Sequence, residues 1–252
     1  MTQYSSVRLG FHGCVFMVYS ISFVYDSIAM DSLDYSYLGR LKFVTVWNMI
    51  LQLVYSFACL VVDIHDRTEA ASPPQKPRWR LQRARDTLHT AIIFPFGTFC
   101  VLVFWGLYFT DRELVYPQKL DNDLKFSYIF NEEQLRDWQD AIIMGRKVNS
   151  LVIKHTLTLV FTLCDKFLVH HRYPKLLVGV CISTCVPLAY IVLLAYLGFQ
   201  HGFWVYPFMA HLDLTQRLAI VLACFVPIAI LQVIGKCLTA IIWRGVYKVK
   251  ET

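Results

Sequence analysis

The chain has 252 residues, of which 56% are hydrophobic, and its formal net charge is +6. One or two soluble domains would fit this length, but the apolar content argues against a soluble protein. Several runs of about 18 to 25 residues carry few charges, and a helix of that length crosses the roughly 30 Å hydrocarbon core of a membrane. The composition therefore predicts an all-α, polytopic membrane protein.

Six apolar runs are predicted to be transmembrane helices, forming one bundle that comprises the single domain 1–252. Few basic residues precede the first run, and no convincing cleavage site follows it, so we interpret it as a retained helix. Prolines inside three of the runs are expected to kink the helices rather than break them. In chain order the runs are Leu9–Tyr25, Phe43–Val62, Thr87–Thr110, Leu151–Val169, Leu176–Leu197 and Leu218–Trp243.

Basic residues gather in the connections that follow the second, fourth and sixth runs. The positive-inside rule therefore predicts that both termini and a basic loop, 65–86, lie in the cytosol. We interpret the basic charge as a signal for orientation and for contact with anionic lipid, not as a nucleic-acid site. A long non-cytosolic loop is expected at 111–148, with an amphipathic helix in its second half that lies on the membrane face or caps the bundle.

The eight cysteines all fall within the apolar runs, which excludes a disulfide framework and favours small, buried packing residues. No CxxC pair has metal-like spacing. The HExxH motif of zinc proteases and the GxSxG motif of serine hydrolases are both missing from the sequence. The sequence thus predicts neither a metal nor a cofactor.

Two of the runs carry polar residues at helical spacing, and polar groups in a membrane are expected to face the bundle interior. Each set lies on one face of its helix, so two polar stripes are predicted to point inward. The stripe of the second run is Thr45, Asn48, Gln52, Tyr55, Ser56 and Cys59, and that of the fourth is His155, Thr158, Thr162 and Asp165.

Thr45 and His155 are predicted to lie at the same depth, because each comes within about two turns of the non-cytosolic start of its helix. An imidazole can accept a proton from a hydroxyl that attacks an ester carbonyl. A hydrogen bond between histidine and threonine is also a common way to satisfy two buried groups between helices. The spacing alone leaves both interpretations open.

Several segments resemble the family of the androgen-induced and androgen-dependent TFPI-regulating proteins, and the resemblance covers nearly the whole chain in order. It rests on KFVT (42–45), FPFGTF (94–99), FWGLYFTDRELVYPQKLDN (104–122), HHRYP (170–174), GFWVYPF (202–208) and the pattern LxxxGKxLxxxIW ending at Trp243.

The resemblance implies a multi-pass membrane hydrolase that cleaves fatty acid esters of hydroxy fatty acids with a threonine and a histidine. The matching positions are Thr45 as nucleophile and His155 as general base and acid. We expect Asn48 and Arg112 to support substrate or oxyanion binding. Segment 123–148 is longer than the corresponding passage of the family. The expected partners are the lipid substrate and membrane lipids, in the endoplasmic reticulum or the plasma membrane.

Two other functions remain possible from the sequence. A non-catalytic membrane protein of this kind would regulate or scaffold another protein. A small transporter would use Asp165, Lys166 and Gln232 to line its path, although the sequence has no visible internal repeat.

Overall fold

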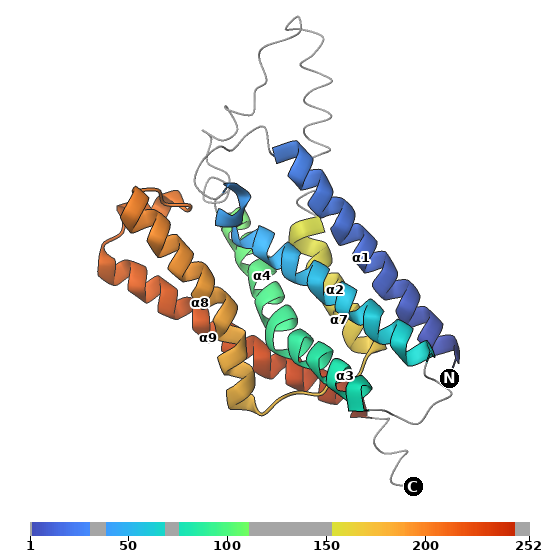
Figure 1. The fold of residues 1–252 in the computed structure, drawn as a ribbon. Coiled ribbons are helices and arrows are strands. Elements are labelled where there is room, and N and C mark those ends of the chain that lie inside the picture. Colours follow the sequence, from blue (N-terminus) through green and yellow to red (C-terminus); the bar gives the residue numbers. More distant parts are fainter. Residues whose placement is uncertain (1, 31–38, 69–75, 111–152, 245–252) are drawn as a thin grey trace, which may run out of the picture.

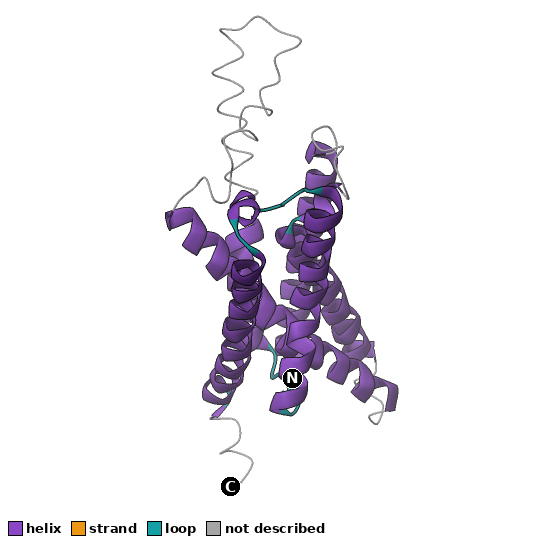
Figure 2. Ribbon diagram, turned by 90° about the vertical axis from the view of Figure 1, so that its left-hand side faces the viewer, coloured by secondary structure: helices purple, strands orange, loops and turns teal. Residues whose placement is uncertain are grey.

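The computed structural model describes residues 2–30, 39–68, 76–110 and 153–244. Within these ranges every regular element is a helix, which confirms the predicted all-α class (Figure 2). The elements are α1 (Thr2–Met30), η1 (Gly39–Lys42), α2 (Val44–Thr68), α3 (Lys76–Leu88), η2 (His89–Ile93), α4 (Phe94–Thr110), η4 (Ile153–Leu157), α7 (Thr158–Leu168), α8 (Leu176–His201), η5 (Pro207–His211) and α9 (Leu214–Ile242).

Five helical segments in the described ranges are long and apolar enough to cross a membrane. These are Ser5–Tyr25, Val44–Thr68, Arg80–Thr110, Leu176–His201 and Leu214–Ile242. The run predicted at 151–169 is helical from 153 to 168, as η4 and α7, and this helix is shorter than the other five. The protein is therefore a multi-pass helical membrane protein.

The predicted loop at 65–86 is wrong in its boundaries. Helix α2 continues to Thr68, and α3 begins at Lys76 and continues through η2 into α4. Apolar periodicity detects only the part of a helix that faces lipid, so it misses a charged extension such as α3. Pro77 is compatible with this start, because the first turn of a helix does not use its N–H groups. The predicted loop 111–148 lies outside the described residues.

Helix α4 is central in the bundle: it contacts α2, α7, α8 and α9, while α1 packs along α2. Helices α8 and α9 form an antiparallel pair beside this group (Figure 1). The start of α1 and the end of α9 lie at the same end of the bundle, which is the lower end in Figure 1. The arrangement agrees with termini on one side of the membrane, and the assignment of that side to the cytosol stays a prediction.

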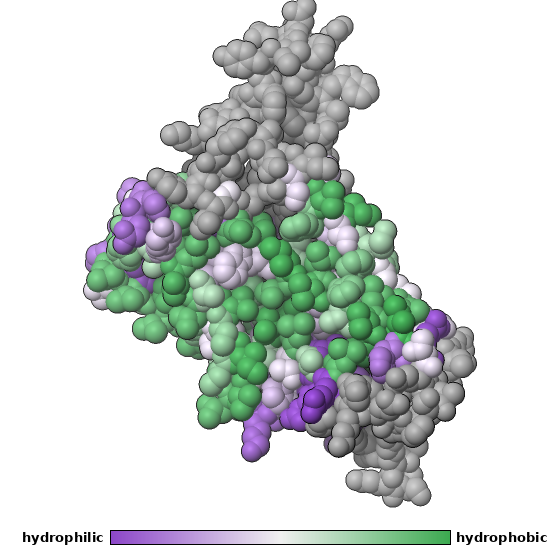
Figure 3. Space-filling view, in the orientation of Figure 1, coloured by the Kyte–Doolittle hydropathy of each residue, from purple (hydrophilic) through white to green (hydrophobic). Residues whose placement is uncertain are grey.

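The outer surface is apolar across the middle of the molecule, and polar residues gather towards its ends (Figure 3). Large side chains such as Leu177, Leu222 and Ile241 are more than half exposed, which fits contact with lipid chains. Cys14, Cys164, Cys181, Cys185 and Cys237 are also exposed. The prediction that the cysteines are buried is thus wrong for these five, because a thiol can face lipid as a small apolar group.

Candidate functional site

The two polar stripes face the interior of the bundle, as the sequence predicts. In α2, Asn48, Gln52, Tyr55, Ser56 and Cys59 are buried, and Thr45 is half-buried. In η4 and α7, all four members of the other stripe are buried, namely His155, Thr158, Thr162 and Asp165. The interior therefore contains the polar groups that lipid would penalise.

The two stripes approach each other at Gly97 of α4. A Cβ atom at Gly97 would lie 3.3 Å from Asn48 Oδ1, 3.2 Å from Thr158 Cγ2 and 2.9 Å from Gln52 Nε2. The absence of a side chain lets α2 and α7 come close to the α4 backbone. Asn48 and Thr158 consequently lie at one level of the bundle, which we call the Gly97 layer.

The replacement Gly97→Leu is expected to destabilise the protein by about 1 to 3 kcal/mol, because the new side chain overlaps Gln52 and Thr158. The control is Gly106→Leu in the same helix, where a Cβ meets no atom within 4 Å. Thermal unfolding of the detergent-solubilised variants measures the difference. Equal melting temperatures for the two variants would contradict close packing at the Gly97 layer.

Thr45 is the second residue of α2, and contacts of the neighbouring backbone define where this helix begins. Tyr190 of α8 donates a hydrogen bond to the Lys42 carbonyl at 2.9 Å, and Trp47 Nε1 donates to the Leu41 carbonyl at 2.7 Å. The first turn of any α-helix also leaves backbone N–H groups without intrahelical partners. The Val46 N–H already donates to the Phe43 carbonyl at 3.1 Å, so the candidate donors for a negatively charged oxygen are the other N–H groups beside Thr45.

His155 lies in the π-turn η4 and is buried. Its imidazole stacks on the ring of Phe104, with 3.4 Å between centroids and 6° between planes. Trp105 Nε1 donates a hydrogen bond to the His155 carbonyl at 3.0 Å. Two neighbouring aromatic residues of α4 therefore fix the ring and the backbone of this histidine.

The positions of the two candidate catalytic residues, Thr45 and His155, can be compared through the Gly97 layer. Thr45 precedes Asn48 by three residues, and His155 precedes Thr158 by three residues. Element η4 also contacts both α2 and α4. Both candidates therefore belong to the turn before the Gly97 layer, in helices that run in the same direction (Figure 1). Arg112, the remaining predicted site residue, lies outside the described residues.

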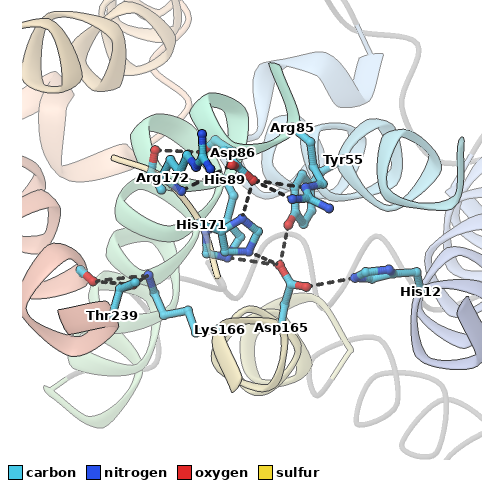
Figure 4. A network of polar contacts seen from close by, with 12 residues as sticks. His12, Tyr55, Arg85, Asp86, His89, Asp165, Lys166, His171, Arg172 and Thr239 are labelled. Atoms are coloured by element: carbon cyan, nitrogen blue, oxygen red, sulfur yellow. Dashed lines mark hydrogen bonds and ion pairs between the residues drawn. The ribbon is translucent and has the colours of Figure 1, made fainter. Parts of the chain in front are cut away.

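A second polar cluster has the Asp165 carboxylate of α7 at its centre (Figure 4). His12 Nε2 of α1 is 2.8 Å from Oδ1 of this carboxylate. On Oδ2, Tyr55 donates a hydrogen bond from α2, and His171 Nε2 lies at 2.9 Å. His89 Nε2 is 3.4 Å from the same Oδ2. Asp165 thus joins four other segments of the chain.

Further carboxylates surround this cluster. His12 Nδ1 is 2.6 Å from Asp63 Oδ2, and His171 Nδ1 is 3.1 Å from Asp86 Oδ1. Arg85 donates to the same Asp86 oxygen at 2.7 Å. All these groups are buried, so the cluster is a connected network of charges and hydrogen bonds in the interior.

The three histidines of this cluster are the functional candidates that the stripes did not reveal. His12, His89 and His171 lie in different segments, at the start of a run or in a connection, and none belongs to a polar periodic face. The available signals were the isolated His12 within an otherwise apolar helix and the HHRYP segment that contains His171. Neither signal indicates that these histidines contact Asp165.

Lys166, the neighbour of Asp165, points towards α9. Its ammonium donates to Tyr173 Oη at 2.7 Å and to Thr239 Oγ1 at 3.3 Å, and it lies over the Phe94 ring at 4.2 Å. Burial raises the pKa of Tyr173, in the 169–175 connection, to about 12, so this phenol is neutral at physiological pH. Lys166 and Asp165 both bind groups of other elements and thereby connect the helices.

The fold and its interior define a polytopic helical membrane protein with a polar core. The model of the FAR-17a/AIG1-like protein family matches residues 7–240, and the chain belongs to this family.

Individual relatives align over most of the chain. The androgen-induced gene 1 protein of Homo sapiens is 28% identical over 87% of this chain and 84% of its own length. The androgen-dependent TFPI-regulating protein of Mesocricetus auratus is 28% identical over 83% of this chain and 80% of its own length. The protein of the same name from Homo sapiens is 29% identical over 81% of this chain and 78% of its own length. No solved structure matches the chain significantly.

Proposed function

We propose that the protein is an integral-membrane ester hydrolase that cleaves fatty acid esters of hydroxy fatty acids, with Thr45 as nucleophile and His155 as general base. The observation that carries the proposal is the common position of the two residues, one turn before the Gly97 layer on adjacent polar stripes. Membership of the family and the resemblance of KFVT to the nucleophile segment support the same pair.

The mechanism begins with attack of the Thr45 hydroxyl on the ester carbonyl. His155 accepts the hydroxyl proton as the Oγ–C bond forms, and then gives this proton to the departing oxygen of the hydroxy fatty acid. Water attacks the acyl-threonine in a second step, again losing a proton to His155. His155 then gives this proton to Thr45 Oγ as the bond between the acyl carbon and Oγ breaks, which releases the fatty acid and restores the threonine hydroxyl and the neutral imidazole.

The protein environment supports this chemistry in two ways. The N–H groups at the start of α2 and the Asn48 amide are the candidate donors to the oxyanion, because they belong to the first two turns around Thr45. The stack of His155 on Phe104 holds the imidazole in one orientation, so the base requires little reorganisation during the reaction.

Covalent labelling tests the nucleophile directly. The detergent-solubilised chain is treated with a fluorophosphonate probe, and the modified peptide is located by mass spectrometry. We expect labelling of Thr45 in the wild-type protein and none in Thr45→Ala. Thr184→Ala is the matched control, since Thr184 lies in α8 and is outside the polar stripes. Labelling of Thr45→Ala equal to that of the wild type would overturn the assignment.

The same experiment separates the hydrolase from a non-catalytic regulator. The names of two relatives describe them as TFPI-regulating proteins. A regulator without a nucleophile gives neither labelling nor ester turnover. The lack of both in a folded preparation would therefore reject the hydrolase.

A further inference from the structure

We propose that His89, Asp165 and His171 form a buried binding site for a divalent transition-metal ion of the zinc class. Each residue offers one ligand atom, and the three ligand atoms all lie within 4.8 Å of one another. All three side chains are at most 2% exposed. The proposal is independent of the Thr45 and His155 chemistry, because these ligands belong to the second polar cluster (Figure 4).

His89 supplies the first argument. Its side chain is completely buried, yet neither of its ring nitrogens makes a hydrogen bond. A buried polar group without a partner costs about 1 to 3 kcal/mol, so native proteins rarely retain one without a reason. Nε2 of this ring lies 3.4 Å from Asp165 Oδ2, on the side of the proposed ion. Coordination to a metal would satisfy the buried nitrogen.

His171 supplies the second argument through its outer partner. Its Nδ1 faces Asp86 Oδ1 at 3.1 Å, and Asp86 is held in turn by Arg85. In metal proteins a ligating histidine commonly donates its other ring N–H to a carboxylate, which fixes the tautomer and orients the ligand nitrogen. With Nδ1 donating to Asp86, Nε2 would release its own proton, now shared with Asp165 Oδ2 at 2.9 Å, and direct its lone pair at the ion when the metal binds.

The distances fit a small ion after modest adjustment. Zinc binds histidine and carboxylate ligands at about 2.0 to 2.2 Å, which places the ligand atoms of a tetrahedral site about 3.3 Å apart. Asp165 Oδ2 is 2.9 Å from His171 Nε2 and 3.4 Å from His89 Nε2. His12 and Tyr55 hold the same carboxylate from α1 and α2. The donor set of two imidazoles and one carboxylate suits zinc and iron(II) better than calcium or magnesium.

One rearrangement accompanies binding. The rings of His89 and His171 are stacked, with centroids 3.9 Å apart and planes 9° apart, so an ion in the plane of one ring lies outside the plane of the other. His89 has no hydrogen bond to hold its ring, and rotation about its side-chain torsions brings a nitrogen towards the ion. The site thereby links η2, α7 and the 169–175 connection.

Metal content and spectroscopy of the full-length chain in detergent test the site. The protein is stripped with a chelator and dialysed, and then titrated with Zn²⁺ or with Co²⁺ as a visible probe. We expect one Zn²⁺ per chain after removal of excess ion, a higher melting temperature with zinc, and the visible bands of tetrahedral Co²⁺. A wild-type chain that retains no zinc and gives only the spectrum of hydrated Co²⁺ would overturn the proposal.

Two variants test His89 as a ligand. Loss of a residue that only hydrogen-bonds to a metal ligand weakens metal binding by about 10- to 100-fold. His89→Ala removes a ligand itself, so we expect it to weaken zinc binding by at least that factor. His89→Cys keeps a ligand and adds a thiolate-to-Co²⁺ charge-transfer band, a signal that a purely structural role of His89 cannot produce. The control is His170→Gln, which changes the residue next to His171 but not a ligand. Equal affinity of His89→Ala and His170→Gln, without the new band in His89→Cys, would overturn the site.

Discussion

Replacement of His155 by alanine is expected to lower the hydrolysis of a fatty acid ester of a hydroxy fatty acid by about 10²- to 10⁴-fold, the usual contribution of a general base. In the proposed mechanism the imidazole stacked on Phe104 accepts the Thr45 proton, and alanine provides no substitute. Release of the hydroxy fatty acid, followed by mass spectrometry with the purified variant in detergent, measures the loss.

A double variant and a control at a distant histidine make this test more specific. Because a nucleophile and its base act as one unit, Thr45→Ala combined with His155→Ala is expected to lose little more activity than either single change. His201→Ala is the control, since His201 is exposed at the end of α8. Nearly wild-type turnover in His155→Ala, or an equal loss in His201→Ala, would contradict the role of His155 as the base.

Replacement of Asp165 by alanine is expected to reduce the free energy of unfolding by about 3 to 5 kcal/mol, the usual cost of removing one partner of a buried ion pair. The change leaves His12, Tyr55 and His171 in the interior without the carboxylate that accepts from them. Unfolding of the detergent-solubilised variant, with chelator present, measures the contribution of the network without bound metal.

Asp213→Ala is the matched control for this prediction. Asp213 is the N-cap of α9, and its exposed carboxylate accepts a hydrogen bond from the Gln216 N–H at 2.8 Å. The loss of such a cap costs about 0.5 to 2 kcal/mol. If Asp165→Ala were no more destabilising than Asp213→Ala, the carboxylate would not be the centre of the interior network.

The sequence predicted most of the helices because the pattern of apolar runs is local. It also predicted which faces of α2 and α7 are polar, since the period of a helix fixes the face on which a residue lies. The ends of the helices were less predictable. Helix α3 is rich in arginine and extends past the apolar run, so hydropathy alone placed it in a loop.

The candidate catalytic pair could be predicted from the sequence, whereas the histidine cluster around Asp165 could not. Thr45 and His155 follow from depth along two helices and from the resemblance to the family. The contacts of Asp165 do not follow in this way, because His12 is 153 residues away along the chain and His171 lies in a connection. No periodicity relates these residues.

The sequence by itself determined that this chain is a helical membrane protein, that its polar stripes face inward, and where Thr45 lies along its helix. These properties depend on the cost of exposing polar groups to lipid and on the helical repeat, both of which act locally. Only the tertiary structure decided that α2 and α7 meet at Gly97, and that four segments converge on Asp165. A buried charge is stable only beside partners that compensate for its desolvation, and the packing of distant helices supplies those partners.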